Sequence, residues 1–234
     1  MNTRMTIVGD NGAGKTTIFN MLTGVYVPTA GEIHFEGHKI SGLRPYEVSR
    51  RGITRTFQNI RLFRVLTVLD NVLIAMHQHA QAGMLSAVLV SSSFSAEEKR
   101  MRDEAMSLLK IFDLEWRANE IASSLPYGQC RNLEIVRALA TKPQLICLDE
   151  PAAGMNHSET HSLMETIVQI RNQFNLSTLL IEHDMKLVMG ICEHILVVDH
   201  GVKSAEGSPK EFQSNPKVIE AYLGKDEEAG HDSH

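Results

Sequence analysis

A glycine-rich segment near the start of the chain restricts the possible folds more than any other feature of the sequence. It has the spacing Gly-x-x-x-x-Gly-Lys-Thr over Gly9–Thr16, and it lies between an apolar run, Thr6–Val8, and an amphipathic pattern, Ile18–Leu22. The run predicts a strand and the pattern predicts a helix, and in that context the motif is a phosphate-binding loop. The glycine spacing differs from that of the dinucleotide motif Gly-x-Gly-x-x-Gly. The segment therefore predicts an α/β fold that binds phosphate groups where a strand ends.

The residue types of this loop suit the phosphates of a nucleotide. Glycines let the backbone wrap closely around the anion, and successive N–H groups at the start of the helix face it. Lys15 is placed to reach the β- and γ-phosphates, and the Thr16 hydroxyl is placed to coordinate Mg²⁺. The predicted phosphate-binding set consists of Gly9, Asn11, Gly12, Ala13, Gly14, Lys15, Thr16 and Thr17.

A second apolar strand ends in two carboxylates. Gln144–Leu148 is followed at once by Asp149 and Glu150, and ligands of open α/β sheets bind at the carboxyl ends of strands. Asp149 would hold the Mg²⁺ of a bound nucleotide, and Glu150 would be the base that orients or deprotonates the attacking water. The alternative is that both acids only cap the turn before Pro151.

Strands and helices alternate over much of the chain. Apolar strands are expected at Ser177–Ile181 and Ile195–Val198, and helices at Arg131–Ala140 and Glu159–Phe174. This alternation predicts an α/β fold with a largely parallel sheet. Two further patterns predict a hairpin at Gly31–Lys39 and a strand over residues 54–58.

A helical stretch interrupts this alternation. Helices are expected at Asn71–Ala80 and Ser95–Phe112, separated by a serine-rich turn. They predict an all-helical subdomain, about residues 68–125, inserted into a single domain of residues 1–224. The last ten residues, 225–234, are polar and acidic, and we expect them to be disordered.

Charge and composition argue against several classes of protein. The net charge of −5 argues against non-specific electrostatic binding of nucleic acid, which requires a strongly basic surface. The three cysteines contain no Cys-x-x-Cys pair, and His157 and His161 lack the His-Glu-x-x-His pattern, so neither a disulfide framework nor a zinc site is expected. No apolar run approaches the roughly 18 residues of a spanning helix, and the first residues lack the apolar stretch of a secretory signal.

Four further motifs resemble those of the ATPases of ABC transporters. Leu125–Gln129, with the sequence Leu-Pro-Tyr-Gly-Gln, resembles the signature motif of that family. Gln58 resembles its glutamine loop, His183 its switch histidine, and Ala153–Asn156 the loop that crosses its dimer interface. With the phosphate loop and its acid pair, these motifs occur in the order and at the spacing of the family, and they cover nearly the whole chain.

The resemblance implies ATP and Mg²⁺ as cofactors and a role for each motif. Gln58 would sense the metal and the water and link the site to the helical subdomain. Gly128 and Gln129 would close on the ATP of a partner subunit. His183 would contact the γ-phosphate and orient the water, since a neutral imidazole can both donate and accept a hydrogen bond. Lys15 would stabilise the charge that develops during transfer.

A narrower resemblance links the chain to the branched-chain amino acid transport ATPases. It rests on Asp149–Asn156, on Glu182–Met189 and on the ending Asn215–Gly224. It implies a peripheral subunit on the cytoplasmic face of the inner membrane. Such a subunit pairs head-to-tail with a second, related ATPase subunit, binds two permease subunits and serves a periplasmic binding protein. The transported solute would be a branched-chain amino acid or a related small polar solute.

The sequence departs from the family pattern at several positions. Only eight residues precede Gly9, where the family has a longer stretch of antiparallel strands with an aromatic side chain that stacks on adenine. A truncated antiparallel subdomain is therefore expected, from a misplaced start or a fragment. Pro126 replaces the usual serine of the signature, and Asp10 replaces the usual proline of the phosphate loop. Two alternatives stay open, a truncated copy without catalysis and a soluble ABC-type ATPase outside transport.

Overall fold

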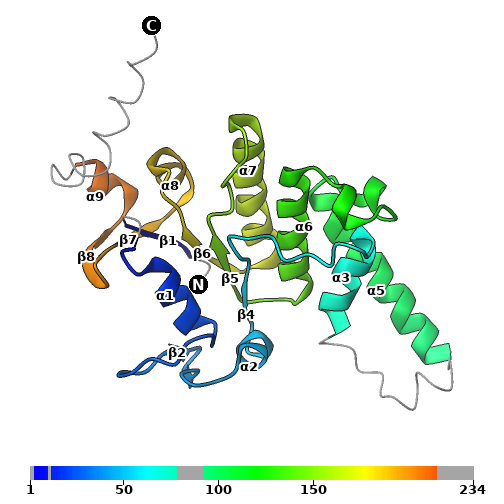
Figure 1. Cartoon of the computed structure of the whole chain (residues 1–234), viewed down its shortest axis with the longest axis horizontal. Helices are drawn as coiled ribbons and strands as arrows, with labels where there is room; N and C mark the ends of the chain where they lie inside the picture. The colour runs from blue at the N-terminus through cyan, green and yellow to red at the C-terminus, as the bar shows by residue number, and fades with distance from the viewer. Residues whose placement is uncertain (1–2, 10–11, 78–91, 215–234) are drawn as a thin grey trace, which may run out of the picture.

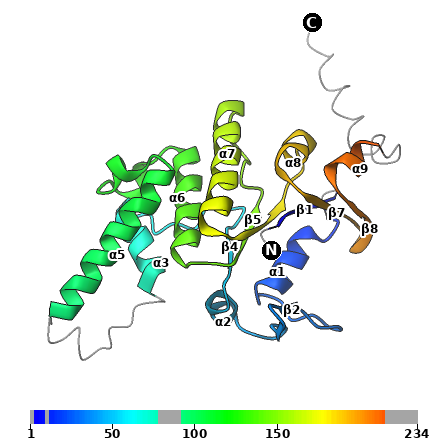
Figure 2. The same cartoon turned by 180° about the vertical axis from the view of Figure 1, so that it is seen from behind.

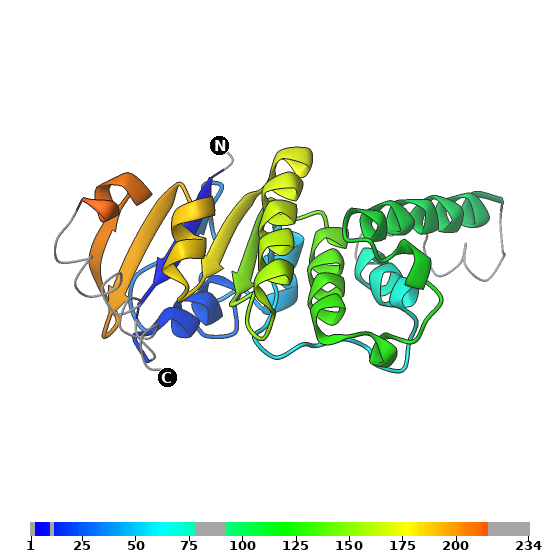
Figure 3. The ribbon, with the colours of Figure 1, turned by 90° about the horizontal axis from the view of Figure 1, so that it is seen from above.

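A computed structural model describes residues 3–9, 12–77 and 92–214 of the chain. They form an elongated molecule, with a sheet at one end and a group of helices at the other (Figures 1 and 3). The strand order is β4-β5-β6-β1-β7-β8. These strands are β1 (Arg4–Val8), β4 (Ile53–Arg55), β5 (Leu145–Asp149), β6 (Ser177–Ile181), β7 (His194–Asp199) and β8 (Val202–Gly207). The first five strands in this order pair in parallel, and β8 pairs antiparallel with β7. The predicted α/β fold with a largely parallel sheet is confirmed.

Side chains of the central strands alternate between two apolar cores. On β5, Cys147 packs in one core with Phe19 of α1 (Lys15–Leu22), whereas Leu148 packs in the other with Ile167 of α7 (His157–Phe174). The same alternation occurs on β6, because successive strand residues point to opposite faces of a sheet. Accordingly, α1 lies on one side of the strands and α8 (Met185–Ile191) on the other, in the views from both sides (Figures 1 and 2).

The predicted helical insert is present as a group of helices beside the sheet. It comprises α3 (Val68–Met76), α5 (Ser92–Ile111) and the short η2 (Glu115–Arg117) and η3 (Ala122–Ser124), and it packs on α6 (Tyr127–Ala140). The backbone of Val68 donates to the carbonyl of Glu120 at 2.9 Å, which closes the base of the group. Its limits as a subdomain stay a prediction, and residues 78–80 of the expected first helix lie outside the described residues.

Several local predictions need correction. The strand expected over residues 54–58 ends at Arg55, and α6 begins at Tyr127 rather than Arg131, directly after Pro126. Proline has no N–H to lose and its backbone angle suits the start of a helix. The predicted hairpin is confirmed as β2 (His34–Phe35) and β3 (His38–Lys39), which within the described chain form a separate two-stranded sheet. The elements that the sequence patterns missed are α2 (Pro45–Arg50), α8, β8 and α9 (Pro209–Gln213).

Some predictions concern residues that the structure does not describe. Asp10 and Asn11 of the phosphate loop, the ending Asn215–Gly224 and the acidic tail 225–234 all lie outside the described residues. Within the described part, no helix has the length and apolar character needed to cross a membrane.

Candidate functional site

The phosphate loop connects β1 to α1, and its glycines have steric reasons. A Cβ atom at Gly9 would overlap the carbonyl oxygen of Val198 on β7. Gly14 has a φ of +100° and is the N-cap of α1 without a side-chain hydrogen bond, and the first turn of α1 contains no acidic residue. A helix N-terminus with no side chain to neutralise it attracts anions. This end of α1 is therefore suited to a phosphate group.

The predicted phosphate and metal ligands of the loop lie at this end of α1. The Nζ atom of Lys15 donates to the carbonyl oxygen of Gly9 at 2.6 Å, so the ammonium lies across the loop itself. Thr16 and Thr17 are exposed at the start of the helix, whereas Ala13 is buried beneath it. The loop thus presents a cation and a hydroxyl group, both of which nucleotide phosphates with Mg²⁺ require.

Three predicted catalytic residues meet at the ends of neighbouring strands. The Nε2 atom of Gln58 donates to Oε2 of Glu150 at 3.1 Å, and the Nδ1 atom of His183 lies 3.8 Å from Oε1 of the same carboxylate. These residues follow β4, β5 and β6, which are parallel neighbours, so their carboxyl ends share one edge of the sheet. Glu150 holds a left-handed backbone, with a φ of +45°, at the turn out of β5. The structure therefore brings together a base candidate, an imidazole and an amide.

Asp149 has a charged partner that the sequence analysis missed. The Nη2 atom of Arg55 lies 2.6 Å from Oδ2 of Asp149, and both side chains are only 5% exposed. The backbone N–H of Asp149 donates to the Thr56 hydroxyl at 3.4 Å. Arg55, the last residue of β4, thus holds the side chain of this acid, and Thr56, the next residue, holds its backbone.

The predicted metal ligands present only oxygen atoms. They are the hydroxyl of Thr16, the carboxylate of Asp149 and the amide oxygen of Gln58. Mg²⁺ prefers such ligands and usually combines one or two protein groups with waters and substrate phosphates. The described residues contain no group of three His, Cys, Asp or Glu side chains that could hold a metal. The residues present fit a Mg²⁺ ion that arrives with a nucleotide.

Glu182 is a second residue that the sequence analysis did not single out. It precedes His183, is only 2% exposed, and accepts from the backbone N–H of Ala152 at 3.3 Å. Burial raises its pKa to about 7, the nearby carboxylates of Glu150 and Asp184 act in the same direction, and the backbone hydrogen bonds oppose them. Glu182 thus ties the loop after Glu150 to the strand end that carries the histidine.

The signature residues lie away from the phosphate loop of their own chain. Gly128 and Gln129 line a cavity of about 310 Å³ between α5, α6 and α7, together with Met155 and Glu159. Neither Lys15 nor Glu150 is among the described residues that line this cavity. The structure therefore does not bring this part of the predicted nucleotide set together with the rest.

A buried ion pair on α6 holds the glutamine loop through hydrogen bonds to its backbone. Arg131 donates to the carbonyl oxygens of Phe57, at 2.7 Å, and of Gln58. The carboxylate of Glu134 accepts from the backbone N–H groups of Phe57 and Arg61 at 3.4 and 3.3 Å. Arg131 and Glu134 lie 3.3 Å apart and are both buried. This contact between the glutamine loop and Arg131 and Glu134 was not predicted from the sequence.

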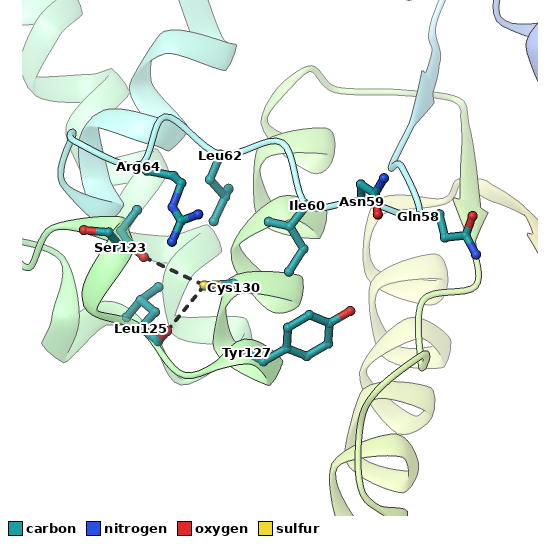
Figure 4. Close-up of a pocket in the computed structure, with 10 residues that line it drawn as sticks. Gln58, Asn59, Ile60, Leu62, Arg64, Ser123, Leu125, Tyr127 and Cys130 are labelled. Carbon is teal, nitrogen blue, oxygen red and sulfur yellow. Dashed lines mark hydrogen bonds between the residues drawn. The ribbon is translucent and has the colours of Figure 1, made fainter.

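A pocket of about 380 Å³ adjoins the glutamine loop on the side of the helical group. Figure 4 shows Gln58, Ile60 and Leu62 along one wall and Leu125 and Tyr127 along the other. The Cys130 thiol donates to the carbonyl oxygens of Ala122 and Leu125 at 3.8 and 3.6 Å, and so its sulfur is turned toward the backbone. The pocket thus lies between the glutamine loop at Gln58 and the signature motif at Leu125–Gln129.

Comparison with known families decides the relationship. The model of the ABC transporter family matches residues 1–153. The chain belongs to this family. A second model, described as branched-chain amino acid ATP-binding cassette transporter, matches residues 205–228. The resemblance predicted from the motifs is therefore confirmed.

Relatives of this ABC transporter chain cover almost its entire length. It is 47% identical to the high-affinity branched-chain amino acid transport ATP-binding protein LivG of Escherichia coli K12, over 94% of the chain and 87% of the relative. The identity to BraF of Pseudomonas aeruginosa, which has the same description, is 45% over the same shares. A solved ATP-binding cassette of an ABC transporter in its ADP conformation matches with a TM-score of 0.79 and 31% identity, over 95% of this chain and 88% of that one.

The ABC transporter relationship confirms several predictions at the level of the family. The fold is that of an ABC ATPase, and the chain is an ATP-binding subunit of an ABC transporter. Nucleotide binding follows from this membership, as does work with membrane-embedded partners. The individual site residues, their roles and the metal stay predictions.

Proposed function

We propose that the chain hydrolyses ATP to power an ABC importer for branched-chain amino acids or related small polar solutes. The observation that carries ATP hydrolysis is the convergence of Gln58 and His183 on the carboxylate of Glu150, at the sheet edge. The solute class rests on the relatives, which are branched-chain amino acid transport proteins.

Each residue of the site would have a separate task in hydrolysis. The loop N–H groups and Lys15 would bind the β- and γ-phosphates, and Thr16 with Asp149 would hold Mg²⁺, which when bound would supply positive charge to the phosphates. Glu150 accepts a proton from the attacking water or orients it. His183, which approaches the other oxygen of that carboxylate than Gln58 does, would hydrogen-bond the γ-phosphate. Positioned charge of this kind contributes most of phosphoryl-transfer catalysis.

The partners belong to the same proposal. Gly128 and Gln129 lie in their own cavity, apart from Lys15, which fits contact with the ATP of a second, related subunit in a head-to-tail pair. The pocket beside Gln58 and Tyr127 is the surface for one of two permease subunits. The pair would lie on the cytoplasmic face of the inner membrane and serve a periplasmic binding protein.

An Mg-ATP titration of the purified chain tests nucleotide binding, with Lys15→Ala as control. We expect saturable binding that the control loses, because the loop depends on that ammonium. Glu150→Gln is expected to retain ATP binding and lose nearly all turnover. Turnover of this variant at the wild-type rate would remove Glu150 as the base, and ATP binding by wild type without any turnover would favour the copy that lacks catalysis. A binding assay on the partner periplasmic protein would identify the solute.

A further inference from the structure

Arg55 is held on several sides at the end of β4. Its Nη1 atom donates to Oδ1 of Asn20 at 2.6 Å, and its Nη2 atom donates to Oδ2 of Asp149 at the same distance. The rings of Phe19 and Phe57 have their centroids 5.3 and 5.1 Å from its Cζ atom. The planar guanidinium presents its donors in a fixed fork. The position of Arg55 is thus defined by contacts that do not depend on Asp149.

The contacts of Arg55 join three segments of the candidate site. Asn20 lies on α1, which begins at the phosphate loop, and Asp149 ends β5. Gln58, which reaches Glu150, follows Arg55 by three residues in the chain. A movement of any of the three segments would therefore change the geometry at this guanidinium.

We propose that Arg55 is a positioning residue that orients the Asp149 carboxylate for the Mg²⁺ of bound nucleotide. The inference rests on the proposed function, because it assigns a task within the same site. A carboxylate has two oxygens and about four acceptor positions, so the charge-assisted bond to Oδ2 leaves capacity for a metal. Outer groups that hold a metal ligand commonly change metal affinity or activity by about 10- to 100-fold when they are replaced.

The opposite role is that Arg55 competes with the metal for Asp149. A competitor would have to leave the carboxylate when Mg²⁺ arrives, and it would then need another place for its charge. Arg55 is 95% buried, since its side chain is 5% exposed, and Asn20 with the two rings keeps it in place. The geometry therefore favours support of the carboxylate, and the competing role makes an opposite prediction for the variants below.

Two variants separate the charge of Arg55 from its geometry. Arg55→Lys keeps a positive charge, but a single ammonium on a flexible stem cannot reproduce the fork that reaches Asn20 and Asp149 together. Asn20→Ala leaves the ion pair intact and removes only its anchor on α1. Arg50→Lys is the matched control, because Arg50 is exposed on α2 and its guanidinium lies over the Tyr46 ring, away from Asn20 and Asp149 in its contacts.

The experiment measures the affinity of the full chain for AMP-PNP, a non-hydrolysable ATP analogue, with Mg²⁺ and with EDTA. The ratio of the two dissociation constants gives the gain from the metal. We expect Arg55→Lys to reduce this gain about 10- to 100-fold, to change the affinity in EDTA less than about twofold, and to lower kcat. Asn20→Ala is expected to reduce the gain less, and Arg50→Lys to leave it unchanged. Circular dichroism confirms that each variant is folded.

Each result has a defined meaning. A full metal gain in Arg55→Lys overturns the inference, a larger gain identifies Arg55 as a competitor, and equal losses with and without Mg²⁺ indicate a role in the fold alone. If Arg55→Lys does not fold, Asn20→Ala decides in the same way. A wild-type chain that binds AMP-PNP in neither condition overturns the proposed function and this inference with it, which distinguishes the two failures.

Discussion

The buried Glu182 carboxylate makes the stability of the fold depend on pH. Its pKa is raised from 4.5 to about 7, chiefly by burial, so the folded chain holds this proton more tightly than the unfolded chain does. Between these two values the unfolded chain releases the proton first, and the free energy of unfolding falls as pH rises. Above about pH 7 the folded protein must bury the charged carboxylate, and the free energy of unfolding has then lost the whole contribution of this proton. At 1.36 kcal/mol for each pKa unit, the loss is about 3 kcal/mol.

Replacement by glutamine removes this dependence at one position. Glu182→Gln is neutral at every pH and similar in shape, so we expect its free energy of unfolding to match that of wild type at about pH 3.5, below both pKa values, and to exceed it by about 3 kcal/mol at about pH 8. Urea unfolding at several pH values, without nucleotide, measures the difference. The control is Glu98→Gln, an exposed position on α5. A difference between Glu182→Gln and wild type that stays constant with pH would refute the reasoning, since no proton would then be linked to folding at this residue.

Three further substitutions test the fold and the loop. Leu148→Ala, at a fully buried position between the sheet and α7, is expected to lower the free energy of unfolding by about 2–5 kcal/mol in urea, and a loss below 1 kcal/mol would contradict the packing described. Thr67→Ala removes the side-chain cap of α3 and is expected to cost about 1 kcal/mol in a thermal melt; an unchanged melt would show that the cap does not matter. Gly9→Ala places a Cβ against the carbonyl oxygen of Val198, so we expect the strain to lower the free energy of unfolding by about 1–3 kcal/mol. We also expect the variant to bind AMP-PNP more weakly than wild type. Wild-type affinity for AMP-PNP would be inconsistent with a loop this close to β7.

Hydrophobic patterns predicted the elements that build the interior of the sheet. The apolar runs at β5 and β6 are long enough to identify buried strands, and the motif between β1 and α1 fixed the first unit. Elements with little apolar surface or with few residues were missed. The strand β8 has mostly exposed residues, and among the described strands its partner is β7, at the edge of the sheet. The helices α8 and α9 are short, with seven and five residues, and helices of that length depend on tertiary contacts rather than on their own propensity.

Motif spacing located the site residues but not the side chains that hold them. Arg55 and Asp149 are 94 residues apart, so no local pattern connects them. The sequence does contain an indirect signal, because a buried charge without a partner is strongly destabilising. An arginine within an expected strand therefore requires an acid somewhere in the fold. Which acid it meets depends on the pairing of β4 with β5, where Arg55 lies opposite Cys147, two residues before Asp149. That register is set by long-range packing, which local sequence patterns do not reveal. It brings Arg55 and Asp149 together and so completes the site.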